Sequence, residues 1–60
     1  MNGNQRMIRM HLEHHLTETD QKENSSVWNL MGYCIGYYGA IDRDVMNVIM
    51  KLYREGWVHD

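Results

Sequence analysis

Apolar residues recur every three to four positions in three short segments of this chain, and proline is absent from all 60 residues. That spacing places the apolar side chains of each segment along one face of an α-helix. Because proline is the residue that most strongly interrupts a helix, its absence leaves each segment free to form one. The sequence therefore predicts an all-α fold of three short helices, in which the second and third form an antiparallel helical hairpin.

The first predicted helix covers about residues 4–16 and is followed by a polar loop. The main apolar stripe of this helix consists of Ile8, Leu12, His15 and Leu16. The next residues, 17–26, read TETDQKENSS and contain no apolar side chain. Such a run has nothing to bury, so it predicts a loop. Ser25 or Ser26 is then a suitable N-cap for the helix that follows.

The second predicted helix, about residues 27–38, is apolar or aromatic around most of its circumference. A helix of this kind is typical of the buried centre of a fold. Gly32 and Gly36 interrupt that pattern one turn apart and leave a flat strip. They predict a close helix–helix contact, within one chain or across a dimer, so that overpacking would destabilise a Gly36→Ala variant. Gly39 is predicted to end the helix in the left-handed conformation.

The third predicted helix covers about residues 42–55 and has the clearest boundaries. Asp42 is a suitable N-cap, and Gly56 followed by Trp57 predicts a Schellman stop in which Trp57 folds back onto Leu52. One apolar stripe consists of Val45, Val48, Ile49 and Leu52, and a second consists of Met46, Met50 and Tyr53. Two stripes cover more of the helix than one small core can bury.

The size of the chain makes a partner subunit the expected source of additional stability. Residues 1–60 form at most one domain, and a domain this small buries only about 60% of the surface of its unfolded chain. Cys34 is the only cysteine, which excludes a disulfide within the chain. We therefore expect a homodimer or an unidentified protein partner to cover the surplus apolar face. The residues predicted for this interaction face are Met46, Met50, Tyr53, Trp57, Trp28 and Tyr37.

The residues that bear chemistry do not assemble a recognisable catalytic or metal site. His11 and His15 have the spacing of two ligands on one helix face, but Leu12 stands where the zinc-protease signature requires Glu. Cys34 lies in the middle of the most apolar segment, where a buried structural cysteine is expected. The sequence predicts no enzymatic activity, no cofactor and no metal site.

An alternative interpretation is a DNA-binding helix-turn-helix protein built from the second and third helices. The run GAIDRDVMNVIMKLYREGWV resembles the recognition helix and following strand of winged-helix regulators. It departs from that pattern at Ile35, where a small residue is usual, and too few residues follow for a wing hairpin. Asp42 and Asp44 would also face the phosphates, where basic side chains are expected. DNA binding is therefore the second choice.

Charge and hydropathy indicate where such a protein acts. The formal net charge of −2 gives no general attraction to nucleic acid or to anionic lipid. No signal peptide is visible, and the longest apolar stretch is shorter than the roughly 20 residues that a membrane span requires. The sequence predicts a cytoplasmic, non-enzymatic interaction or regulatory protein that binds another protein, of a kind typical of short phage or bacterial accessory proteins.

Overall fold

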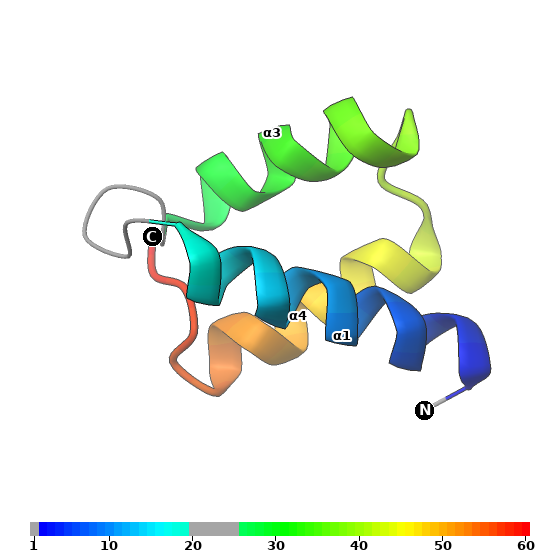
Figure 1. Cartoon of the computed structure of the whole chain (residues 1–60), viewed down its shortest axis with the longest axis horizontal. Helices are drawn as coiled ribbons and strands as arrows, with labels where there is room; N and C mark the ends of the chain where they lie inside the picture. The colour runs from blue at the N-terminus through cyan, green and yellow to red at the C-terminus, as the bar shows by residue number, and fades with distance from the viewer. Residues whose placement is uncertain (1, 20–25) are drawn as a thin grey trace.

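The computed structural model describes residues 2–19 and 26–60, which fold into three helices. These are α1 (Gly3–Glu18), α3 (Val27–Tyr38) and α4 (Arg43–Arg54), and the described residues contain no strand. The predicted all-α class is confirmed. Helix α4 packs against both α1 and α3, and Figure 1 shows α3 and α4 running in opposite directions.

Helix α1 is longer than the sequence predicts. It begins after Asn2, whose side chain accepts a hydrogen bond from the backbone N–H of Gln5 at 2.7 Å. It continues through Thr17 and Glu18, which the all-polar run placed in a loop. The Thr17 hydroxyl donates a hydrogen bond to the Glu13 carbonyl of the preceding turn at 2.8 Å, so this polar side chain has a partner within the helix. The polar composition of Thr17 and Glu18 therefore indicated exposure to solvent and not the end of the helix. Residues 20–25 of the predicted loop lie outside the described residues.

The bounds of α3 coincide with those predicted, and its caps are formed by the expected kinds of residue. The Ser26 hydroxyl accepts a hydrogen bond from the backbone N–H of Trp28 at 3.2 Å. Gly39 follows the last turn with a φ of 84°, the left-handed region that favours glycine. Ser26 is thus the N-cap, and Gly39 the C-cap, of α3.

The bounds of helix α4 lie within one residue of those predicted at each end. The Asp42 carboxylate accepts a hydrogen bond from the backbone N–H of Val45 at 2.9 Å. At the other end Gly56 has a φ of 88°, and the backbone N–H of Trp57 donates to the Leu52 carbonyl at 2.9 Å. This bond is the 6→1 bond of a Schellman motif, which confirms the predicted stop.

The hydrophobic core is centred on α4, which corrects the expectation that the second helix is the most buried. The buried apolar residues of the described chain are Ile8, Leu12, Leu16, Leu30, Cys34, Val45, Val48, Ile49, Leu52 and Val58. Helix α4 contributes four of them, whereas α3 contributes only Leu30 and Cys34. An apolar helix needs neighbours on several sides to be buried, and α3 has α4 as its main neighbour.

The residues after α4 return to the start of α3 and hold it in place. Val58 is 4% exposed and belongs to the core. The backbone N–H of Val27 donates to the His59 carbonyl at 2.6 Å, within an isolated bridge between Ser26 and His59. Figure 1 shows the C-terminus beside the beginning of α3. These contacts were not predicted from the sequence.

Polar contacts connect α1 to both ends of α4. Asp44 accepts hydrogen bonds from Gln5 at 2.9 Å and from Asn4 at 2.6 Å, and those bonds, Gln5 first, lower the pKa of its carboxyl. Arg9 of α1 donates to Glu13, four residues further along the same helix, and to Glu55 at the end of α4. None of the helices in the described ranges combines the length and the apolar character that a membrane-spanning helix requires.

Candidate interaction surface between α3 and α4

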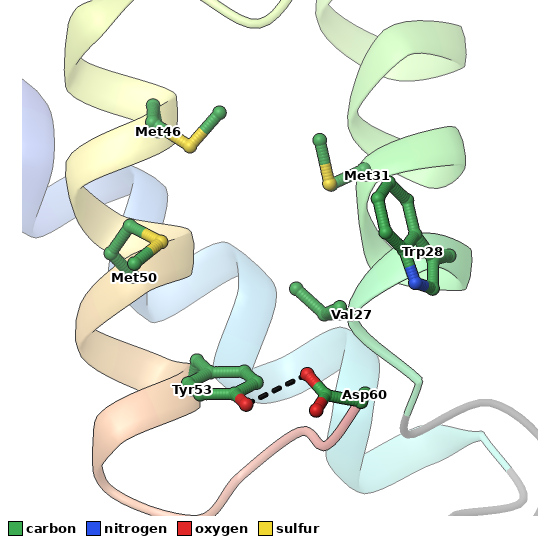
Figure 2. A pocket seen from close by; sticks show the side chains of 7 residues that line it. All are labelled: Val27, Trp28, Met31, Met46, Met50, Tyr53 and Asp60. Atoms are coloured by element: carbon green, nitrogen blue, oxygen red, sulfur yellow. Dashed lines mark hydrogen bonds between the residues drawn. The ribbon is translucent and has the colours of Figure 1, made fainter.

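An apolar groove of about 410 Å³ lies between α3 and α4. The residues that line it are Val27, Trp28, Met31, Met46, Met50, Tyr53 and Asp60. Figure 2 shows the methionines of α4 facing Met31 across the groove, with Val27 and Trp28 also on the α3 side. All but Asp60 present apolar or aromatic surface, so the groove favours an apolar occupant.

Helical spacing explains why these side chains share one surface. Met46, Met50 and Tyr53 are four and three residues apart, so they follow one another along a single side of α4. Met31 and Trp28 stand in the same relation on α3. The core stripe of α4 lies beside its methionine stripe, which is why the groove opens directly above the core.

Large apolar side chains along this groove remain accessible to solvent. The exposed fraction is 70% for Trp28, 53% for Ile35, 45% for Met50 and 36% for Met46. Ile35 lies one turn beyond Met31 on α3 and extends the surface past the groove. We call these residues, with Met31 and Tyr53, the apolar face.

A hydrogen bond between α4 and the C-terminal residue borders the groove at one end. The Tyr53 hydroxyl donates to the Asp60 carboxylate at 2.7 Å (Figure 2), and this bond raises the pKa of the Tyr53 phenol. Asp60 is the one charged side chain among the lining residues. The groove is therefore apolar along its length and polar only at this end.

Four of the six residues predicted for the interaction face meet in this groove: Met46, Met50, Tyr53 and Trp28. The other two lie elsewhere. Trp57 is partly buried against the core, and the ring of Tyr37 packs 4.3 Å from that of His11. Val27, Met31 and Asp60 also line the groove but were not predicted from the sequence. Of these, only Met31 could have been predicted, because its spacing of three residues from Trp28 places both on the same side of a helix.

His11 and His15 of α1 face tyrosines of α3, which the sequence did not predict. His11 Nδ1 lies 2.6 Å from the Tyr38 hydroxyl, and His11 Nε2 lies 2.8 Å from the Tyr33 hydroxyl. Both ring nitrogens of His11 are therefore engaged within the chain. The His15 ring stacks on Tyr33 at 3.6 Å, and burial, with a smaller effect of His11, lowers the pKa of His15. In the part of the chain that the structure describes, no three His, Cys, Asp or Glu residues are grouped to hold a metal ion.

Cys34 is fully buried in the hydrophobic core. Its exposed fraction is 0%, and burial raises the pKa of the thiol to about 11. A thiol protonated at neutral pH is a poor nucleophile because the thiolate is the reactive form. The side chain therefore acts as a small apolar group in the core.

Gly32 and Gly36 do not make the close contact within the chain that their spacing predicts. A Cβ built at either position meets nothing within 4 Å, and both residues are exposed. This corrects the prediction of tight helix packing inside one chain. The physical reason is that these residues lie on the side of α3 away from α4, where the described chain places no second backbone.

A Gly36→Ala variant is therefore expected to be more stable than the wild type, contrary to the overpacking expectation. The added methyl group enters open space, and alanine has the higher helix propensity, which contributes up to about 1 kcal/mol. Urea denaturation followed by circular dichroism measures the change. A loss of stability that grows with protein concentration would instead place Gly36 in a contact between copies.

Comparison with known proteins adds no relative: no protein-family model, curated protein or solved structure matches this chain. The apolar face and its groove are the features of the molecule from which a function can be argued.

Proposed function

We propose that this protein is a small, non-enzymatic interaction or regulatory protein that binds another protein through the apolar face of α3 and α4. The observation that carries the proposal is the groove of about 410 Å³, lined by side chains of two helices and left open to solvent. Exposed apolar surface gathered in one place marks an interaction site in a small globular protein.

The chemistry of the groove suits a protein segment. Three methionines, Met31, Met46 and Met50, line it. Methionine is flexible and polarisable, so it adapts to apolar partners of different shape. A groove between two helices is also the form of surface that receives the apolar side of an amphipathic helix.

The α3–α4 hairpin is the unit that carries this face, and the proposal includes a homodimer as its simplest assembly. A surface left open on one copy is present on every copy, and two-fold pairing is the commonest arrangement of soluble oligomers. A single free thiol, Cys34, suits the reducing cytoplasm as the place of action.

The proposal is tested with two variants that make the same chemical change at different places. Met50→Glu introduces a charge into the groove, whereas Met10→Glu introduces it on α1, where Met10 is 67% exposed and does not line the groove. Tagged wild type, Met50→Glu and Met10→Glu are used to capture proteins from a lysate of the source cells. We expect a protein retained by wild type and Met10→Glu and lost from Met50→Glu. Equal capture by all three would contradict binding through this face.

DNA binding through α3 and α4 remains the alternative, and the charges at the start of α4 disfavour it. Asp42 caps the helix, and hydrogen bonds from Gln5 and Asn4 hold the pKa of Asp44 low, so the Asp44 carboxylate stays ionised at neutral pH. A phosphate backbone is repelled by this arrangement. A salt-sensitive shift of DNA that is lost in Arg43→Ala would favour the alternative over protein binding.

A further inference from the structure

We infer that a second copy of this chain occupies the apolar face in the isolated protein, with Trp28 of each copy inserted into the groove of the other. The inference rests on the proposed function, because it concerns the same face. It names the occupant of the groove when no other protein is present. A different partner would then bind in competition with self-association.

The first argument is that a projecting side chain and a recess lie on the same surface. Trp28 is 70% exposed and stands at the α3 side of the groove (Figure 2), while Met46 and Met50 border the groove on the α4 side. In a two-fold interface the same patch meets itself, so residue i of one copy contacts residue j of the other and the reverse. A surface that carries both a projection and a recess satisfies this condition.

The second argument is the area available. Trp28, Ile35, Met46 and Met50 have exposed fractions of 70%, 53%, 36% and 45%. At about 200 Å² for each large side chain, these four expose roughly 400 Å² per copy. Val27, Met31 and Tyr53, all partly exposed, add to this. Two copies together therefore approach the roughly 1,000 Å² at which specific interfaces begin.

The third argument is the charge of the face. Of the residues that line the groove, only Asp60 carries a charge, and it already accepts a hydrogen bond from Tyr53. Two identical faces therefore meet without a central pair of like charges. A two-fold axis through the middle of the groove places the two Asp60 side chains at opposite ends of the interface. The burial of apolar area is then not opposed by desolvation of charges at its centre.

The experiment compares two variants of exposed aromatic residues on α3. Trp28→Ala removes the projecting side chain, and Tyr37→Ala is the matched control, because Tyr37 is 65% exposed and does not line the groove. Sedimentation equilibrium at micromolar concentrations gives the dimer dissociation constant of each, and circular dichroism checks that each is folded. We expect Trp28→Ala to raise the constant at least about 30-fold, the loss of one binding hot spot. Tyr37→Ala should change it by less than about threefold.

A second measurement follows Trp28 itself and needs no change at that position. In a Trp57→Phe variant Trp28 is the only tryptophan. Its fluorescence emission is expected to move to shorter wavelength as the protein concentration rises through the dissociation constant, because the indole leaves water. If the emission maximum stays at the same wavelength while the dimer forms, Trp28 is not inserted into the groove of the other copy.

The remaining outcomes also decide the inference. It is wrong if the folded wild type stays monomeric across the micromolar range, if a small apolar molecule co-purifies in the groove, or if Tyr37→Ala weakens the dimer and Trp28→Ala does not. Each of these results leaves the proposed function to be judged by the capture experiment with Met50→Glu and Met10→Glu. The two proposals can therefore fail separately.

Discussion

Replacement of Leu12 by alanine is expected to remove about a third or more of the free energy of unfolding of this protein. Leu12 is 0% exposed and belongs to the cluster through which α1 packs on α4. Deletion of a fully buried leucine side chain costs about 2.7–5 kcal/mol. A domain of this length has a free energy of unfolding of only about 3–9 kcal/mol. The loss is therefore comparable with the whole stability of the fold.

Met10→Ala is the matched control, because it removes a large apolar side chain from the same helix at a position that is 67% exposed. Its free energy of unfolding should lie within about 0.5 kcal/mol of the wild type. Urea denaturation of the three proteins, followed by far-ultraviolet circular dichroism, measures both changes. If Leu12→Ala were as stable as Met10→Ala, the packing of α1 on α4 described above would be wrong.

The second large effect concerns the reactivity of Cys34. Burial raises the pKa of its thiol to about 11, above the ordinary value of 9.0. Near pH 8 this shift alone lowers the thiolate fraction about 100-fold, and the side chain is also closed to reagents. We expect iodoacetamide to modify the folded protein at least about 100-fold more slowly than the protein in concentrated guanidinium chloride. Equal rates would show that Cys34 is accessible.

The same burial makes stability depend on pH in the alkaline range. The pKa of Cys34 is higher in the folded chain than in the unfolded chain, so the unfolded state loses its proton first as the pH rises. Below about pH 9 the thiol is protonated in both states, so Cys34 does not change the free energy of unfolding. Between about pH 9 and pH 11 it is deprotonated only in the unfolded state, which lowers the free energy of unfolding by roughly 2–3 kcal/mol at the upper limit.

Cys34→Ala is the control for this alkaline loss. The variant removes the thiol, so the part of the loss that Cys34 causes should disappear. Burial also raises the pKa of Tyr33 and Tyr38, so a smaller decrease remains in the variant. Urea denaturation of both proteins at several alkaline pH values measures the difference. Identical pH profiles would show that Cys34 does not carry the effect.

The local features of the fold were predictable from the sequence. The N-cap Asp42, the left-handed Gly39 and the stop at Gly56 lie where they were expected, and Ser26 is one of the two serines expected to cap α3. Each of these signals acts over a few neighbouring residues, so neighbouring residues suffice to find it. The stripe that buries Val45, Val48, Ile49 and Leu52 followed in the same way from the helical period.

The candidate surface was predictable only in part. Trp28, Met46, Met50 and Tyr53 were expected on an interaction face, and they line one groove. Their spacing along each helix predicts which residues share a side. It does not predict which sides of two helices face the same groove, and Tyr37 and Trp57, which were also expected on the face, do not line it. Asp60 reaches the groove through the path of the C-terminal residues, which no local pattern encodes.

The tertiary structure alone decided which helix is central and which residues far apart in the sequence meet. Helix α3 is the most apolar segment, yet α4 is the most buried helix of the described residues, because both α1 and α3 pack closely against it. The contacts of His11 with Tyr33 and of Arg9 with Glu55 join residues 22 and 46 positions apart. A sequence pattern reports the apolar side of a helix, whereas burial depends on what the rest of the chain places against that side. Within residues 2–19 and 26–60, Leu30 and Cys34 of α3 are buried, whereas Trp28, Ile35 and Tyr37 remain exposed.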